Sequence, residues 1–89
     1  MTVLIDGAAI ETRDELHDSL QAQLALPEYY GRTLDALYDC LTDIQEDTEL
    51  RLLHAQMLNE QLGFYAGAMQ RMICDACEEN PHLSFVSEE

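Results

Sequence analysis

Hydrophobic residues recur along the chain in two patterns: short aliphatic runs, and repeats at every third or fourth position. The runs are typical of buried strands, and the repeats are typical of one buried helix face. Polar or acidic segments separate them. Together the patterns predict three strands and four helices: strands over 2–6, 49–54 and 82–87, and helices over 12–24, 34–44, 55–62 and 65–79.

Capping residues support the expected helix ends. Thr12 followed by Glu15 matches a capping box, in which a hydroxyl and a carboxylate satisfy free amide groups at the helix start. Thr33 is a suitable N-cap for the second helix. Gly63 provides a stop for the third helix, and Pro81 prevents the fourth from continuing.

Strands and helices alternate along the sequence. Neighbouring parallel strands need long crossover connections, and the helices supply them, so this order predicts a parallel sheet. We therefore expect an α/β fold, with a small three-stranded parallel sheet packed on one side by helices. At 89 residues, without an internal repeat or a linker, the chain is expected to form a single domain over residues 1–89.

One stretch, Leu24 to Asp43, combines an irregular first half with an amphipathic helix. Pro27 disfavours a helical backbone at the residue before it, and Gly31 permits a turn that other residues resist. The helix that follows has two different sides. Its hydrophobic side is expected to hold Leu34, Leu37, Leu41 and Ile44, and its opposite side Asp35, Asp39 and Asp43, which we call the acidic face.

The acidic face is unfavourable for stability and suitable for binding. Like charges four residues apart cost a helix roughly 0.2–0.5 kcal/mol per pair. Tyr29, Tyr30 and Gly31 place aromatic surface and an adaptable loop directly before the helix. Tyrosine is enriched at interface hot spots because it combines a large ring with a polar tip. The helix and the loop are therefore a candidate protein-binding surface, with an ordinary solvated helix face as the alternative.

The strongly negative charge of the chain indicates which kinds of partner it can bind. The sequence contains 18 acidic residues, four arginines and no lysine, for a formal net charge of −14. Direct nucleic-acid binding and anionic-membrane binding both need a basic surface, so neither is expected. A cationic protein partner is favoured, because opposite charges accelerate association. The sequence shows neither an apolar run of about 18 residues nor a secretory signal, so we expect a cytoplasmic location.

Candidate catalytic and metal-binding chemistry is sparse. The histidines, His17, His54 and His82, lie on different expected elements and lack ligand spacing. Asp35 and Asp39 could pair as catalytic carboxylates, but they are expected on an exposed face and not in a pocket that would tune their pKa values. Phosphate-binding loops and nucleophile-elbow motifs are missing. We expect no enzyme activity, no cofactor and no metal.

The cysteines are Cys40, Cys74 and Cys77. An odd number argues against a secreted disulfide scaffold and favours reduced thiols. Cys74 and Cys77 form a C-x-x-C pair, which in a redox or metal protein usually lies at a βα turn or beside a second pair. This pair is expected in the middle of a helix, and its position gives a thiol-redox or metal function little support.

The stretch with the acidic face also carries a family resemblance. It extends through Leu26-Pro27-Glu28-Tyr29-Tyr30-Gly31, Leu34-Asp35-Ala36-Leu37 and Asp39-Cys40-Leu41. These segments resemble barstar, the intracellular inhibitor of the secreted bacterial ribonuclease barnase. The residues from Val3 to Gly7 and from Leu16 to Leu20 fit the same register, and beyond about Thr42 the likeness rests on the order of elements. The resemblance implies a barstar-like fold and a 1:1 complex with a basic, barnase-like ribonuclease.

The resemblance also implies roles for individual residues. Barstar-like inhibitors block the ribonuclease active site with this helix and the preceding loop, so that carboxylates mimic RNA phosphate. Asp39 would pair with the arginines and the catalytic histidine of that site, and Asp35 with a second cationic group at its rim. Tyr29 would pack against the catalytic histidine, and Gly31 would allow close backbone approach. Three more residues match contact positions of the family: Tyr38, Thr42 and, on the last helix, Asp75.

The chain departs from the family pattern at three positions. Tyr38 and Ile44 occupy positions where barstar has tryptophan, and Arg32 places a cation within the implied interface. These departures preserve the inhibitor class and affect which ribonuclease is bound. The alternative function is an acidic immunity or binding protein for a different cationic partner, such as a non-ribonuclease toxin or a regulatory protein.

Overall fold

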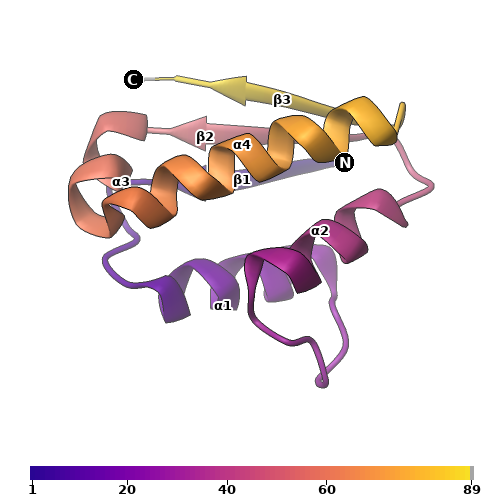
Figure 1. Ribbon diagram of the computed structural model, residues 1–89, viewed down its shortest axis with the longest axis horizontal. Helices are drawn as coiled ribbons and strands as arrows, with labels where there is room; N and C mark the ends of the chain where they lie inside the picture. Colours follow the sequence, from indigo (N-terminus) through magenta and orange to yellow (C-terminus); the bar gives the residue numbers. More distant parts are fainter. Residues whose placement is uncertain (89) are drawn as a thin grey trace.

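The computed structural model describes residues 1–88, which form three strands and four helices (Figure 1). In chain order these are β1 (Thr2–Asp6), α1 (Arg13–Leu24), α2 (Leu34–Thr42), β2 (Thr48–Leu53), α3 (Ala55–Leu62), α4 (Phe64–Glu79) and β3 (Leu83–Ser87). The type and order of the elements agree with those expected from the sequence. Their boundaries differ from the expected ones by one or two residues.

The strands form one parallel sheet in the order β1-β2-β3. In the central strand, Leu50 is aligned with Val3 of β1 on one side and with Phe85 of β3 on the other. Val3, Leu50 and Leu52 are buried, whereas Leu4, which points the other way, is 45% exposed. The helices therefore cover one face of the sheet, and Figure 1 shows α4 crossing it. The predicted α/β fold is confirmed.

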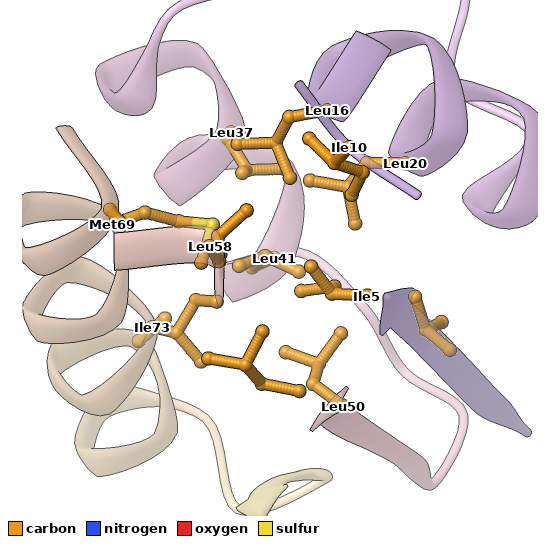
Figure 2. Close-up of a cluster of buried hydrophobic side chains, with 14 of the residues drawn as sticks. Ile5, Ile10, Leu16, Leu20, Leu37, Leu41, Leu50, Leu58, Met69 and Ile73 are labelled. Carbon is orange, nitrogen blue, oxygen red and sulfur yellow. The ribbon is translucent and has the colours of Figure 1, made fainter. Parts of the chain in front are cut away.

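A hydrophobic cluster fills the space between the helices and the sheet. Figure 2 shows side chains of α1, α2 and α4 converging on those of the strands. Leu37 and Leu41 are the buried residues of α2, and Met69 and Ile73 approach from α4. Because Leu37 and Leu41 are held in this cluster, the opposite side of α2 must face solvent. The core thereby determines the direction of the acidic face.

Helix α2 ends earlier than its hydrophobic pattern predicted. It stops at Thr42, with Asp43 as its C-cap, and Ile44 lies beyond the helix. The buried side chain of Asn80, which follows α4, accounts for this end. Its amide donates to the carbonyl oxygens of Leu41 and Ile44 at 3.0 and 2.9 Å. Asn80 thus satisfies carbonyl groups that the end of α2 leaves free, and it fixes α2 relative to α4.

Other boundaries differ from the prediction by one residue, among them those at His54, His82 and Phe64. His54, expected to end the second strand, has a left-handed backbone with a φ of 54° and lies beyond β2. His82, expected to begin the third strand, belongs to a turn, in which its amide donates to the Asn80 side chain at 2.9 Å. Helix α4 begins at Phe64 rather than Tyr65, directly after Gly63. Local backbone conformation and one polar side chain set these ends, which hydrophobic spacing does not reveal.

Gly7 provides a test of the β1–β2 packing. Its amide donates to the Leu53 carbonyl at 2.8 Å, and a Cβ at this position would clash with the backbone carbonyl of His54. We predict that Gly7→Ala lowers the free energy of unfolding by about 1–3 kcal/mol, the usual cost of overpacking. Gly67→Ala in α4 is the control, because its Cβ would meet only the end of the Arg71 side chain, at 3.4 Å.

For Gly67→Ala we expect a gain of up to about 1 kcal/mol, since alanine is the better helix former. Urea denaturation of both variants beside the wild type measures the two changes. Similar stabilities for Gly7→Ala and the wild type would contradict the packing described for this turn.

Candidate protein-binding site

The N-cap predicted at Thr33 is present. Its hydroxyl accepts a hydrogen bond from the Ala36 amide at 3.1 Å, so α2 has a defined first turn. Asp35 lies in that turn, where the helix dipole favours a carboxylate. Asp39 follows one turn later, and Asp43 is the C-cap. All three residues of the acidic face are exposed.

The α1–α2 loop, residues 25–33, projects from the molecule beside α2 (Figure 1). Its two tyrosines differ sharply: Tyr29 is 88% exposed, whereas Tyr30 is buried. The Tyr30 hydroxyl lies 2.7 Å from Nδ1 of His17. Tyr30 therefore anchors the loop to α1, and Tyr29 is left with its ring in solvent.

The left-handed residues of this loop are Ala25, which is the C-cap of α1, and Arg32, and not Gly31. Arg32 has a φ of 54°, whereas Gly31 has no positive φ. The expectation that Gly31 supplies a turn closed to other residues is therefore wrong. Its small size has a different use, because a Cβ there would lie only 3.3 Å from the Ala36 Cβ. Gly31 allows the loop to lie close to the first turn of α2.

Arg32 does not present a free cation beside the acidic face. Its guanidinium is turned toward α1, where it forms an ion pair with Asp18 at 2.8 Å. The carboxylates of the site have no such partner. Among residues 1–88, no ion pair involves the acidic face or Asp75.

Tyr29, Asp39 and Asp43 border one groove of about 440 Å³ between the loop and α2. The rest of its lining is mostly apolar: Leu24, Leu26, Pro27, Cys40 and Ile44. Asp35 instead borders a second hollow, which it shares with Arg32 and Tyr65. The acidic face is therefore divided, with two carboxylates on the groove beside Tyr29 and one on the neighbouring hollow.

Tyr38 of α2 lies near two carboxylates of α4, those of Glu79 and Asp75. It is half-buried where these two helices pack. Burial raises the pKa of its hydroxyl, and three nearby carboxylates raise it further: Glu79, Asp75 and Asp39, in decreasing order. Asp75 therefore lies on the side of α4 that borders α2. Glu79 is an acidic neighbour that the sequence analysis missed, and its position four residues after Asp75 is the signal that could have found it.

Thr42 is half-buried at the end of α2. Its hydroxyl donates to the backbone carbonyl of Tyr38 at 3.0 Å. Of the predicted α2 residues, the structure brings Asp39 to the groove beside Tyr29, whereas Asp35 borders the other hollow. Asp75 lies near enough to Tyr38 for its charge to raise the pKa of that hydroxyl. Gly31 lies in the same loop as Tyr29.

The described residues include few features typical of a metal site or a redox thiol. Within residues 1–88, no group of three or more His, Cys, Asp or Glu side chains is arranged to hold a metal ion. Burial raises the pKa of the Cys77 thiol, and the neighbouring Cys74 raises it further. Reactive thiols have lowered pKa values, so Cys77 lacks that property. In the same part of the chain, no helix is long and apolar enough to cross a membrane.

Comparison with known proteins identifies the family. The family model described as barstar (barnase inhibitor) matches residues 1–86. The chain belongs to the barstar family. A Bacillus subtilis (strain 168) protein named "Putative ribonuclease inhibitor YrdF" is 42% identical over 78 residues, which is 86% of each chain. The family match extends well beyond Thr42, where the sequence resemblance rested on the order of elements.

Membership of the barstar family confirms the resemblance and the α/β fold. It places the chain among ribonuclease inhibitors and not among enzymes. The individual contacts implied by the resemblance stay predictions: Tyr29, Gly31, Asp35, Tyr38, Asp39, Thr42 and Asp75.

In this barstar-family chain, a buried histidine supports the loop. His17 is 1% exposed, with Nδ1 2.7 Å from the Tyr30 hydroxyl and Nε2 2.6 Å from the Tyr65 hydroxyl. A neutral imidazole has one donor and one acceptor nitrogen, so one tyrosine accepts and the other donates. Burial, followed by the charge of Arg32, lowers the pKa of His17. Burial also raises the pKa of Tyr30 to about 12, which keeps its hydroxyl protonated.

These pKa shifts predict a pH dependence of stability. Because the pKa of His17 is lower in the folded chain, the unfolded chain takes up a proton first as the pH falls through 6.5, the ordinary histidine value. The contribution of neutral His17 is complete above that pH and is lost below it. We predict that the free energy of unfolding falls more in the wild type than in His17→Gln between about pH 8 and about pH 5.

Urea denaturation across this pH range measures the difference. His54→Gln is the control, since His54 is exposed and its removal should leave the wild-type pH dependence intact. Parallel pH curves for the wild type and His17→Gln would contradict the assignment of this dependence to His17.

Proposed function

We propose that this protein inhibits a barnase-like ribonuclease by blocking its active site with α2 and the α1–α2 loop. One observation carries the proposal. Tyr29 and Asp39 border the same groove, the tyrosine ring is exposed, and the carboxylate has no ion-pair partner among residues 1–88. The family resemblance assigns these two residues to the catalytic centre of the enzyme.

The chemistry of the target explains why carboxylates suit this surface. A ribonuclease active site binds RNA phosphate, so it presents arginines and other cationic donors. A carboxylate accepts two such donors in a bidentate arrangement, much as a phosphate does. In this proposal Asp39 occupies the phosphate position, and Asp35 pairs with a cation at the rim. The net charge of −14 accelerates the approach to a basic enzyme.

The remaining residues of the site would complete the contact. Tyr29 would stack on the catalytic histidine of the enzyme, and Gly31 would admit its backbone at close range. Tyr38 and Thr42 would extend the interface along α2. Asp75 would add a negative charge from α4. The proximity of Tyr38 to the α4 carboxylates supports this last assignment, because one cationic group of the enzyme could approach both helices.

We propose a 1:1 complex, formed in the cytoplasm, in which this chain performs no chemistry. Inhibition would result from occupancy of the substrate site alone. The decisive experiment is titration of a barnase-like ribonuclease, preferably the enzyme encoded beside this protein. Activity should disappear near one equivalent of inhibitor, and an Asp39→Ala variant should require an excess.

The acidic face provides a matched pair for testing the geometry. Asp39 and Asp43 both border the groove, lie on one helix side and carry the same charge. We predict that Asp39→Ala weakens binding by at least about 2 kcal/mol, or roughly 30-fold in Kd, because it removes the central anion. Asp43→Ala should have a much smaller effect, since Asp43 would lie at the edge of the contact.

Inhibition assays on the two variants measure this difference, and urea denaturation verifies that both remain folded. Equal losses would show that net charge, and not the position of Asp39, governs binding. If no barnase-like ribonuclease is inhibited at about micromolar concentration, the acidic surface must instead serve another cationic protein.

A further inference from the structure

We propose that Arg32 is a positioning residue that fixes the α1–α2 loop against α1 before any partner binds. Its effect on affinity rests on the inhibitor function proposed above, whereas its effect on the loop is a property of the free protein. The family resemblance places Arg32, a cation, within an interface that is otherwise anionic. The structure gives this cation a different use.

The guanidinium of Arg32 spans three acceptors on one side of α1. It donates to the Asp18 carboxylate at 2.8 Å, to the Asp14 backbone carbonyl at 2.9 Å and to the Gln21 side-chain oxygen at 3.1 Å. These three residues follow one another at intervals of four and three positions, so they lie along a single helix face. A planar guanidinium can satisfy acceptors in several directions, whereas the ammonium of lysine is a compact point charge.

The same helix holds the beginning and the middle of the loop. The Gln21 side-chain amide donates to the Pro27 carbonyl at 3.0 Å, and the Leu26 amide donates to the Gln21 carbonyl at 3.0 Å. Tyr30 is anchored to His17, as described above. With Arg32 at the far end, α1 therefore holds the loop at its beginning, middle and end. Tyr29 is the large side chain that these contacts leave in solvent.

The backbone of Arg32 supports the same conclusion. Its φ of 54° lies in the left-handed region, which an arginine rarely adopts and which glycine or asparagine tolerates better. The conformation is thus unfavourable for the residue that adopts it. Contacts of the side chain must offset this cost, and the three hydrogen bonds to α1 are the contacts available to do so.

By fixing the loop, Arg32 improves binding without contacting the partner itself. Ordering a flexible loop at the moment of association costs conformational entropy, and a loop that is already ordered avoids this cost. Electrostatics alone predicts the opposite change in affinity when Arg32 is removed. Removing a cation from an inhibitor of net charge −14 should strengthen its attraction to a basic enzyme. The two explanations can therefore be separated by the direction of the change.

The first measurement uses the free protein. In Arg32→Asn the left-handed backbone is retained but the side chain can no longer reach α1. Backbone amide relaxation should show order parameters for residues 28–31 falling from about 0.85 toward 0.6 or below. Asp18→Asn, which removes the negative charge of the nearest acceptor, should loosen the same residues. The control is Arg71→Gln, which removes an exposed arginine of α4 and should leave the loop unchanged.

The second measurement is inhibition of the ribonuclease. Arg32→Asn should bind about tenfold more weakly, whereas Arg71→Gln should bind as well as the wild type or more tightly. The double variant Arg32→Asn/Asp18→Asn should lose no more affinity than Arg32→Asn alone, because Arg32→Asn has already broken the contact with Asp18. Urea denaturation should give similar midpoints for these variants and the wild type, which distinguishes a loosened loop from a destabilised fold.

The outcomes separate this inference from the proposed function. A rigid loop in both Arg32→Asn and Asp18→Asn would overturn the positioning role, and so would unchanged or tighter inhibition by Arg32→Asn. Failure of the wild type to inhibit any barnase-like ribonuclease would overturn the proposed function instead. In that case the relaxation measurement still decides whether Arg32 orders the loop.

Discussion

The burial of one imidazole between two phenol hydroxyls is the interaction that anchors the α1–α2 loop to the helices. His17 belongs to α1, Tyr30 to the loop and Tyr65 to α4, so this contact joins three segments that are distant in the sequence. Unpaired polar groups in a core are costly, and each nitrogen of His17 has a partner. The imidazole thereby holds Tyr30 inward, and the adjacent Tyr29 can be exposed without loosening the loop.

The carboxylates on α1 and on α2 differ in whether they have an ion-pair partner within the molecule. On α1, Asp18 forms an ion pair with the guanidinium of Arg32 at 2.8 Å, so its charge is compensated within the molecule. Asp35 and Asp39 lie on α2 without such compensation. Like charges four residues apart destabilise a helix. An acidic face on a helix held in place by buried leucines is understandable if a cationic protein supplies the missing partners.

Local patterns predicted the elements of this fold well. Leucines at helical spacing identified the buried side of α2, and the hydroxyl of Thr33 marked its start. The end of α2 could not be predicted in this way, because it depends on Asn80, which lies 39 residues beyond Leu41. The boundaries at His54 and Phe64 depend on local backbone conformation, on which hydrophobic spacing carries no information.

The residues of the candidate site could be listed from the sequence, but their arrangement on the surface could not. A helical wheel places Asp35 and Asp39 on one side of α2, yet each borders a different hollow in the structure. The expectation that Gly31 provides a turn that other residues resist failed for a related reason. Glycine can adopt a left-handed backbone, but tertiary contacts decide which residue does so, and the acceptors on α1 favour Arg32. Arg32 is a cation within the anionic interface that the family resemblance implies. In the proposed function it would serve that interface indirectly, by holding the loop on which Tyr29 is exposed.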